Sequence, residues 1–357
     1  MLPLGQFANN PNASNSDSHN FVGIARLAAA GEQLREGHQV EYRTLEAKSL
    51  LNRVSANARV PFQWTINPYR GCEFGCKYCY ARYTHEFMEL RDPNAFEKSI
   101  YVKQATVGLS QELRRVKPGE AIAIGTATDP YQPAEKYYEI TRKILEELAL
   151  PVVHGFDIGI ITKSNLVTRD IDLLQRIGEH NRLHVSLTIT TLDVELARKL
   201  EPRAPRPDLR MEAVRRLREA GITAGVSCAP VLPGINDDPR DLERLVKAAA
   251  QAGAQYVWAN SLFLKDCSAA VFMPWLEQHY PHLVPGYRRR YGERAFLPRA
   301  IAERTQLLVR HLETKHGIRR PRNEPVGGQT DLGKRPAQRE EWLVPLPPPQ
   351  MELFAAS

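Results

Sequence analysis

Three cysteines lie within eight residues, a clustering that thiols scattered by chance would not give. They are Cys72, Cys76 and Cys79, with the spacing C-x3-C-x2-C. Thiolates at this spacing can surround one side of a metal centre. Gly71 and Gly75 allow the backbone to turn tightly and to approach that centre closely. The spacing therefore predicts a metal site.

Two kinds of centre suit three thiolates. A zinc ion needs a fourth ligand, and His85 follows six residues after Cys79. A [4Fe–4S] cluster takes the three cysteines and leaves one iron open to an exogenous ligand. Only five cysteines occur in 357 residues, which excludes a disulfide framework.

The chain around the cysteines alternates short apolar segments rich in Ile and Val with helical patterns. The predicted strands are Phe62–Asn67, Ala121–Gly125, Ile158–Thr162, Leu183–Thr188, Thr223–Ala229 and Gln255–Ala259. The predicted helices are 141–150, 170–178, 194–200, 211–221 and 241–253. Repeated strand–helix units favour a parallel sheet, either open or curled into a partial barrel. Chemistry in such folds sits at the carboxyl ends of the strands, where the cysteines follow the first one.

Composition places the chain among ordinary globular proteins, with 43% hydrophobic and 25% charged residues. No apolar run approaches the roughly 18 residues that span a bilayer. Residues 1–20 are polar and lack the pattern of a secretory signal, so we expect a disordered lead and a cytoplasmic protein without membrane contact. The net charge of +7 is compatible with a nucleic-acid partner without requiring one. Residues 319–357 are rich in Pro and Arg and predict a flexible, disordered tail.

The cysteine motif, with Tyr78 just before its third cysteine, resembles that of the radical S-adenosylmethionine (SAM) enzymes. INPYRGCEFGCKYCYAR, GTATDPYQPAEK, ITKSNLVTRDIDLL, LTITTLD, EPRAPRP and APVLPGIND resemble the spore photoproduct lyase-like subgroup, often labelled DNA repair photolyase-like. The resemblance covers roughly residues 60–285. It implies an α/β fold with a partial (β/α)6 TIM-like barrel, an N-terminal extension and a disordered C-terminal tail. The expected divisions are 1–20, 21–60, a core at 61–285, a helical extension at 286–318 and the tail at 319–357.

The same resemblance implies two cofactors, a [4Fe–4S] cluster and SAM, and an electron donor such as a flavodoxin or ferredoxin. Reductive cleavage of SAM would give a 5′-deoxyadenosyl radical that abstracts hydrogen from the substrate. The implied cluster ligands are Cys72, Cys76 and Cys79. The implied SAM contacts are Tyr78 near the adenine, Thr126, Thr128 and Asp129 near the methionine amino group, Lys163 and Arg203 near the carboxylate, Ser164 directly after Lys163, and Ser186 and Thr188 near the ribose.

The chain departs from that subgroup at one position. Spore photoproduct lyases have a cysteine beside the segment after the second strand, which they use as a hydrogen donor. Gly125 and Thr126 stand there in this chain, so repair of that photoproduct is in doubt. Cys267, and with less support Cys228, are the remaining donor candidates. Three functions stay open: a radical SAM enzyme acting on a nucleic-acid base, one acting on a peptide or small metabolite, and a zinc-binding module without catalysis.

Two further segments suggest partners. The stretch Tyr287–Tyr291 combines three arginines with two tyrosines, which suits nucleic-acid backbones and stacked bases. Near the end of the tail, Gln350, Met351, Leu353 and Phe354 resemble the short peptide by which bacterial replication and repair proteins bind the DNA sliding clamp. Clamp binding would favour a DNA substrate over a metabolite.

Overall fold

The computed structural model describes residues 22–320, except 32, 37–39, 56–59, 91, 106–107 and 293. The predicted disordered lead and the sliding-clamp peptide lie outside the described residues. So does the predicted tail, apart from Arg319 and Arg320. Among the helices that the structure describes, none has both the length and the apolar character needed to cross a membrane.

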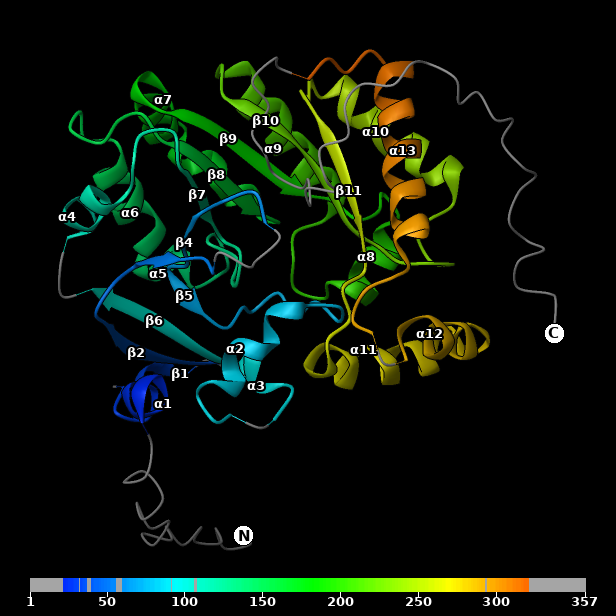
Figure 1. Cartoon of the computed structure of the whole chain (residues 1–357), viewed down its shortest axis with the longest axis horizontal. Coiled ribbons are helices and arrows are strands. Elements are labelled where there is room, and N and C mark those ends of the chain that lie inside the picture. Colours follow the sequence, from blue (N-terminus) through cyan, green and yellow to red (C-terminus); the bar gives the residue numbers. More distant parts are fainter. Residues whose placement is uncertain are drawn as a thin grey trace, which may run out of the picture.

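A seven-stranded sheet forms the centre of the molecule, in the order β11-β10-β9-β8-β7-β4-β3 (Figure 1). Its six parallel strands are β4 (Trp64–Ile66), β7 (Ala121–Ile124), β8 (Asp157–Thr162), β9 (Arg182–Thr188), β10 (Thr223–Val231) and β11 (Val257–Ser261). All six predicted strands are therefore confirmed, the last with a shift of two residues. The seventh strand, β3 (Leu51–Arg53), pairs antiparallel with β4. The fold is a mixed α/β partial barrel, as the resemblance implied.

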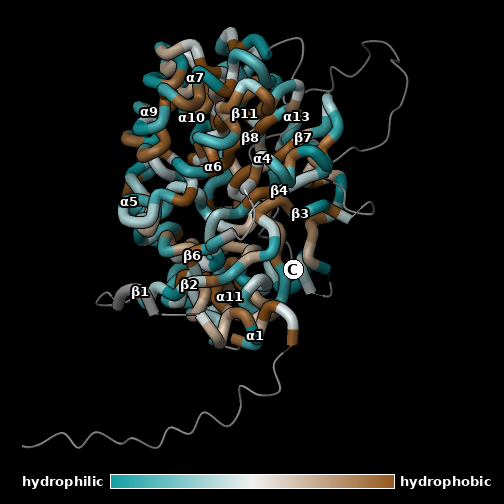
Figure 2. The backbone as a smooth tube through the Cα atoms, turned by 90° about the vertical axis from the view of Figure 1, so that its left-hand side faces the viewer, coloured by the Kyte–Doolittle hydropathy of each residue, from teal (hydrophilic) through white to brown (hydrophobic). Residues whose placement is uncertain are grey.

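Helices follow the strands and cover the outer face of the sheet (Figure 1). They are α6 (Ile140–Leu148), α7 (Ile171–His180), α9 (Pro207–Glu219) and α10 (Pro239–Gln251). Helix α8 (Val194–Leu200) also follows a strand, but its Leu196 and Leu200 pack in one cluster with the cysteine loop. Side chains alternate along each strand, so Val185 and Leu187 of β9 join one apolar cluster with Leu174 and Ile177 of α7. Figure 2 shows hydrophobic segments concentrated around β8, β11 and α10. This outer layer is the main core.

The inner face of the barrel carries polar and small residues instead. His184 and Ser186 alternate with the apolar positions of β9 and are both buried. A Cβ at Gly159 would lie 2.5 Å from the His184 ring, and one at Gly225 would lie 2.5 Å from the Tyr256 ring. The glycines therefore make room inside the barrel for polar and aromatic side chains of neighbouring strands.

A second, four-stranded sheet lies beside the barrel in the order β1-β2-β6-β5. It contains β1 (Gln33–Glu36), β2 (Glu41–Ala47), β6 (Ser99–Ala105) and β5 (Tyr69–Arg70). This sheet could not be predicted from the sequence, because β5 has two residues and the parallel pairing of β2 with β6 joins distant segments. Since β3 pairs with β4 and β2 with β6, the elements of residues 21–60 are built into both sheets.

Short elements connect these layers. They are α1 (Gly23–Ala29), η2 (Tyr80–Arg82), α2 (Tyr83–Glu86), α3 (Ala95–Lys98), α4 (Leu109–Glu112), η3 (Leu113–Arg115), α5 (Glu135–Tyr138) and η4 (Asn165–Asp170). The chain then closes with α11 (Asp266–His279), η5 (Pro281–Leu283), α12 (Val284–Tyr291) and α13 (Arg299–Lys315).

Helix α13 protects the exposed edge of the barrel sheet at β11 (Figure 1). The Val257 backbone N–H donates to Glu313 Oε1 at 2.6 Å, and Arg320 Nη2 donates to the Val257 carbonyl oxygen at 3.0 Å. Arg320 also pairs with Glu313 at 2.7 Å. These side chains thus form hydrogen bonds with backbone groups of β11 that could otherwise pair with another strand.

Candidate functional site

The loop that follows β4 carries the three cysteines to the carboxyl ends of the parallel strands. Gly71 has φ +80°, and a Cβ there would lie 2.8 Å from the Ser99 carbonyl oxygen. Gly75 has φ +63°, and a Cβ there would meet the Arg203 guanidinium at 3.3 Å. Both glycines occupy the left-handed region that other residues avoid. The predicted role of glycine in folding this loop is confirmed.

The three thiols are withdrawn from water. Cys72 and Cys76 are buried and Cys79 is half-buried. Burial raises the pKa of Cys76 to about 12, against the opposing charge of Lys163. Burial also raises the pKa of Cys72 and of Cys79. Three thiols on one glycine-folded loop are a donor set that a cationic metal centre would convert to thiolates, so the residues fit an iron–sulfur cluster.

The fourth ligand proposed for the zinc alternative is engaged elsewhere. His85 Nε2 donates to the Ser99 carbonyl oxygen at 3.0 Å, and its ring lies edge-on to Phe96. Burial lowers the pKa of His85 to about 4, which keeps it neutral in this contact. Within the described residues, no three His, Cys, Asp or Glu side chains gather closely enough to hold a single ion. A cluster does not require such a gathering, because each thiolate binds a different iron.

The loop after β7 brings Thr128 against the cysteine loop. The Thr128 hydroxyl donates to the Gly71 carbonyl oxygen at 2.6 Å, and Gln132 Nε2 donates to the same carbonyl at 3.1 Å. Nearby, Asn67 Oδ1 accepts a hydrogen bond from the Ala127 N–H at 2.8 Å. The hydroxyl of Thr128 therefore holds the two loops together rather than standing free for a ligand.

Asp129 joins that loop to the end of β8. Its carboxylate accepts the Thr162 hydroxyl at 2.6 Å, the Lys163 N–H at 2.7 Å and the Tyr131 N–H at 2.9 Å. Burial raises its pKa, although these donors oppose the shift. Both carboxylate oxygens are thus engaged. Thr126 lies just before this turn, and Asn67 Nδ2 donates to its hydroxyl at 3.4 Å.

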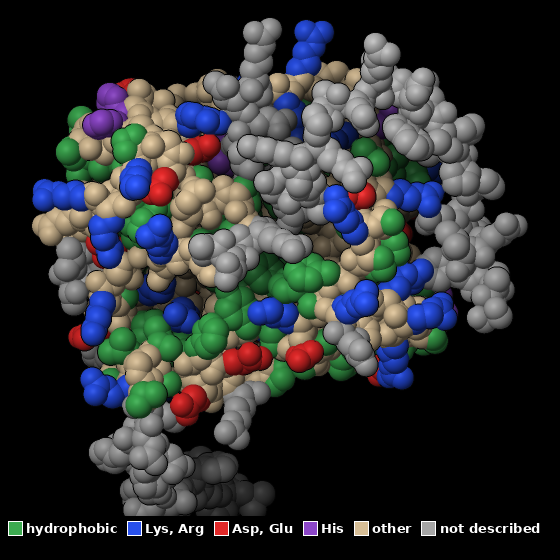
Figure 3. Space-filling view, in the orientation of Figure 1, with side chains coloured by type: hydrophobic (Ala, Val, Ile, Leu, Met, Phe, Trp, Pro, Cys, Tyr) green, Lys and Arg blue, Asp and Glu red, His purple; other side chains and the backbone are tan. Residues whose placement is uncertain are grey.

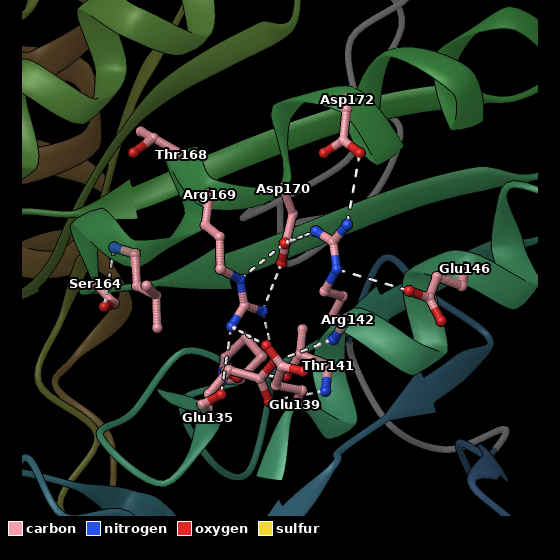
Figure 4. Close-up of polar contacts among 12 residues, drawn as sticks. Glu135, Glu139, Thr141, Arg142, Glu146, Ser164, Thr168, Arg169, Asp170 and Asp172 are labelled. Carbon is pink, nitrogen blue, oxygen red and sulfur yellow. Dashed lines mark hydrogen bonds and ion pairs between the residues drawn. The ribbon is translucent and has the colours of Figure 1, made fainter. Parts of the chain in front are cut away.

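Lys163 reaches from the end of β8 over the cysteine loop. Its Nζ lies 5.6 Å from the centroid of the Tyr78 ring, within the range of a cation–π contact. Burial alone would lower the pKa of Lys163. The Cys76 thiol and Glu201 have the larger effect, so the net shift of the Lys163 pKa is upward. Lys163 therefore remains a cation beside the cysteines. Ser164 has a different role, since its hydroxyl accepts the Leu166 N–H at 3.2 Å and caps η4 (Figure 4).

Sequence reasoning missed a buried ion pair beneath the loop. Glu201 and Arg210 are each 1% exposed, and their side chains lie 2.5 Å apart. The Tyr78 hydroxyl donates to Glu201, and Arg210 Nη1 donates to the Thr188 carbonyl oxygen at 3.0 Å. Burial would raise the pKa of Glu201, but Arg210 and Lys163 outweigh burial and lower it. One feature of the sequence could have revealed this pair. Arg210 lies on the apolar face of α9, in register with Val214 and Leu217, where an arginine is rare unless it is paired.

The predicted ribose contacts differ in their availability. The Ser186 hydroxyl lies 2.9 Å from the Tyr256 hydroxyl, so it already has a partner inside the barrel. Thr188 shares the inner face of β9, nearer the carboxyl end, and its hydroxyl bonds to no described residue. Arg203 is half-buried, and its guanidinium lies beside Gly75 on the cysteine loop. Thr188 and Arg203 therefore remain the freer of the predicted contacts.

The two remaining cysteines face different surroundings. Cys228 belongs to the main apolar core, with its sulfur 3.9 Å from the Thr190 carbonyl oxygen. Cys267 is the second residue of α11, is partly exposed, and has its sulfur 3.9 Å from the Tyr80 carbonyl oxygen. Tyr80 follows Cys79 directly, so the structure places Cys267 beside the cysteine loop and Cys228 away from it.

Comparison with known proteins agrees with this geometry. The Radical SAM superfamily matches residues 66–246. An uncharacterized protein of Mycobacterium tuberculosis is 34% identical over 301 residues, covering 84% of this chain and 87% of its own. An uncharacterized protein of Methanocaldococcus jannaschii is 28% identical over 244 residues, covering 68% and 85%. Among solved structures, a spore photoproduct lyase mutant with bound AdoMet and dinucleoside spore photoproduct has a TM-score of 0.58 at 15% identity, covering 84% of this chain and 86% of that one.

Proposed function

Because the chain belongs to the radical SAM superfamily, we propose that Cys72, Cys76 and Cys79 hold a [4Fe–4S] cluster and that the chain cleaves SAM reductively. When bound, such a cluster supplies the electron that cleaves SAM to methionine and a 5′-deoxyadenosyl radical, which abstracts hydrogen from the substrate. The observation that carries the proposal is the loop of three thiols, two buried and one half-buried, at the carboxyl ends of the parallel strands, with the half-buried cation of Lys163 and hydroxyl groups around it.

The chain's own residues would bind and orient SAM. Lys163, whose Nζ lies over the Tyr78 ring, pairs with the methionine carboxylate in this proposal, with Arg203 as a second cation. Thr126 and Thr188 offer hydroxyls to the amino group and the ribose. Thr128, Asp129, Ser164 and Ser186 already have protein partners, so we assign the first three to positioning the loops and Ser186 to the interior of the barrel. An external electron donor such as a flavodoxin or ferredoxin would reduce the cluster.

We propose a nucleic-acid base as the substrate class. Spore photoproduct lyase, whose fold this chain shares, was solved with a dinucleoside photoproduct bound. Repair of that same lesion is not part of the proposal, since Gly125 cannot carry the cysteine expected there. A Cβ at Gly125 would lie 2.5 Å from the Ile161 carbonyl oxygen and from Pro130 Cδ, and its φ is +89°.

Cys267 is the hydrogen donor we propose instead. Its sulfur lies beside Tyr80, and part of the side chain is open to solvent. Burial and the nearby Glu86 raise its pKa, so the sulfur keeps its hydrogen at neutral pH. A donor of a hydrogen atom must be a thiol rather than a thiolate. Cys228 is not proposed, since it faces the apolar core.

The test is reductive cleavage of SAM by anaerobically reconstituted protein, with and without DNA or RNA. We expect the protein to be brown, with broad absorbance at about 400 nm. We also expect it to form methionine and 5′-deoxyadenosine. Cleavage stimulated by nucleic acid would support the substrate class. Cleavage stimulated only by a peptide or small metabolite would redirect it. Colourless protein with stoichiometric zinc would contradict radical chemistry.

A further inference from the structure

A run of aromatic rings leads outward from the cysteine loop to the surface. Tyr80 is 40% exposed, and its hydroxyl donates to the Thr126 carbonyl oxygen across the site. The Tyr80 ring centroid lies 6.0 Å from that of Phe263, and the Phe263 ring stacks on Phe296 at 4.3 Å with an interplanar angle of 22°. The rings therefore form a continuous path from the position after Cys79 to solvent.

The outermost ring is exposed although the backbone holds it firmly. Phe296 is 65% exposed. Phe263 and Phe296 form an antiparallel bridge, and the Leu264 N–H donates to the Ala295 carbonyl oxygen at 2.9 Å. A large ring kept in water by a fixed backbone is a common feature of binding surfaces, because folding alone gains little from it. The ring pair is thus already arranged for a flat partner.

Two cations lie near these rings, Lys265 against the Phe263 ring and Arg294 two residues before Phe296. Lys265 is exposed, and its Nζ lies 4.6 Å from the Tyr83 ring centroid and 5.9 Å from that of Phe263. Arg294, two residues before Phe296, is exposed and makes no side-chain ion pair with a described residue. Figure 3 shows Lys and Arg side chains gathered around α11 and α12, next to hydrophobic ones. The surface therefore combines flat apolar faces with cations.

The segment Tyr287–Tyr291 contributes to this surface differently from the sequence-based expectation. Its tyrosines are buried, and their hydroxyls donate to the carbonyl oxygens of Pro233 and Leu262 at 3.0 and 3.1 Å. Those rings support α12 and cannot stack on a base. Arg288 and Arg289 are exposed, so only the cationic part of the motif faces solvent.

We propose that Tyr80, Phe263, Phe296, Lys265 and Arg294 form an aromatic platform that binds an unpaired nucleotide, stacking its base and contacting its phosphates. This inference rests on the proposed function, whose substrate it narrows to a single-stranded or extruded base. Every base presents a π-face, and base–aromatic stacking with cations along the backbone is how single strands are bound. The charge of the platform favours this occupant over an apolar peptide or a second copy of the chain. DNA and RNA both present the bases and phosphates that the platform would contact.

The experiment measures binding of the full chain to fluorescently labelled 12-nucleotide DNA and RNA single strands and to the matching duplexes, by anisotropy and without SAM. Phe296→Ala should weaken single-strand binding about five- to hundred-fold, the range for loss of one stacked base. Phe296→Trp should retain it. Lys265→Gln should make the slope of log affinity against log salt concentration less steep, by about the contribution of one phosphate contact. Val152→Ala, which removes an exposed apolar side chain between α6 and β8, is the matched control.

The outcomes separate the platform from the chemistry. Equal binding by the wild type and Phe296→Ala, with an unchanged melting temperature, overturns the platform while leaving SAM cleavage untouched. A change in oligomeric state on Phe296→Ala without any nucleic-acid binding also overturns it and identifies a contact between copies. Loss of binding in Phe296→Ala, alongside failure of SAM cleavage in the wild type, supports the platform and contradicts the proposed reaction. Preference for DNA or RNA then names the source of the nucleotide.

Discussion

Tyr78 shows how one side chain can belong both to the cysteine motif and to the barrel. Its hydroxyl donates to Glu201, whose charge is balanced by Arg210 beneath β9, while Lys163 lies over its ring. The position of the cysteine loop is therefore tied to the carboxyl end of β9 by buried charges. Removing one member of a buried, hydrogen-bonded pair leaves its partner without compensation. We therefore regard Glu201 as part of the candidate site.

Cys76 carries the clearest prediction at the scale of single residues. Cys76→Ala should abolish both cluster binding and SAM cleavage, because two protein thiolates are too few to retain the cluster. The fold should persist, since Cys76 lies outside the main apolar core of the barrel. Iron and sulfide content, absorbance and far-ultraviolet circular dichroism measure these effects.

Cys228→Ala is the matched control for Cys76, because Cys228 is equally buried but faces the core. That variant should keep its iron. Near wild-type turnover of SAM by Cys76→Ala would show that the ligand assignment is wrong.

Lys163 makes a separate prediction about SAM. If Lys163 pairs with the SAM carboxylate, Lys163→Ala should weaken SAM binding by about 1–3 kcal/mol, the range for a charge-assisted hydrogen bond. The cluster spectrum should be unchanged. Calorimetric titration of reconstituted protein measures the affinity, and Lys199→Ala, an exposed position on α8, should leave it unaltered. If Lys163→Ala bound SAM with unchanged affinity, Lys163 would not contact the carboxylate, and its role would be limited to balancing the charge of Glu201.

The residue types of the site could be predicted from the sequence, whereas their hydrogen-bond partners could not. Motif spacing singled out the three cysteines and both glycines of the loop. It could not show that the hydroxyl of Thr128 donates to the Gly71 carbonyl, because that contact joins loops from different strands. The cap that Ser164 forms on η4 is a local contact, with Leu166, that motif spacing alone did not single out. The roles assigned to these residues from the resemblance stay predictions.

At the scale of elements, the barrel was predictable and the second sheet was not. Helical periodicity and apolar strands repeat locally in the barrel, so each βα unit could be recognised by itself. The second sheet pairs β2 with β6, which are separated by more than fifty residues and by the cysteine loop. Its strands are held by contacts such as the Tyr42 hydroxyl to Glu73 at 2.9 Å, which no local pattern reveals.

Buried charges also fix the position of η4, the segment that follows Lys163 and Ser164. Arg169 pairs with Glu135 at 2.7 Å and with Asp170 at 2.8 Å, and Arg142 pairs with Asp170 at 2.6 Å (Figure 4). Glu135 also accepts the Tyr69 hydroxyl of β5 at 2.5 Å. One fully buried carboxylate thus joins the second sheet, α5 and η4. The network holds the segment that carries Lys163 toward the cysteines.

Glu135→Gln tests this arrangement. It should lower the free energy of unfolding by about 1–3 kcal/mol, the range for a hydrogen bond to a charged group, because Arg169 keeps Asp170 but loses its second carboxylate partner. Urea unfolding followed by circular dichroism measures the change. Glu212→Gln breaks an exposed pair with Arg215 and should leave the unfolding midpoint nearly unchanged. Equal shifts in the two variants would show that the network contributes no more than a surface pair.

At the scale of the whole molecule, α13 closes the described part of the chain. Its edge contact at Val257 uses Glu313 and Arg320, so the described chain ends against the last barrel strand. The residues that resemble a sliding-clamp peptide follow in the sequence, outside the described residues. We propose that this segment connects the barrel to a clamp, which would deliver the enzyme to newly replicated or repaired duplex. Such a partner supports DNA over RNA as the source of a base.

The physical chemistry of the motif suits a groove on a bacterial clamp. Met351, Leu353 and Phe354 supply three apolar side chains at the end of a Pro-rich segment, and Gln350 supplies hydrogen-bond donors and an acceptor. The prolines at 347–349 reduce the conformational entropy lost when the segment is ordered on a partner. Ala355 and Ala356 follow, where the archaeal and eukaryotic clamp motif has aromatic residues. A bacterial clamp is therefore the partner to test.

The last prediction is that a peptide of residues 343–357 binds a bacterial sliding clamp with a dissociation constant of about micromolar order, typical of short linear motifs that order on binding. The same peptide with Leu353→Ala and Phe354→Ala should lose binding, since its two anchoring side chains are gone. A Glu352→Ala peptide is the matched control and should still bind, because that position carries no anchor. Titration by fluorescence anisotropy decides among these outcomes. Equal binding by the native and double-variant peptides, or none by the native one, would remove the clamp as a partner. The nucleotide-binding platform beside Cys79 would then be the remaining structural reason for choosing a nucleic-acid substrate.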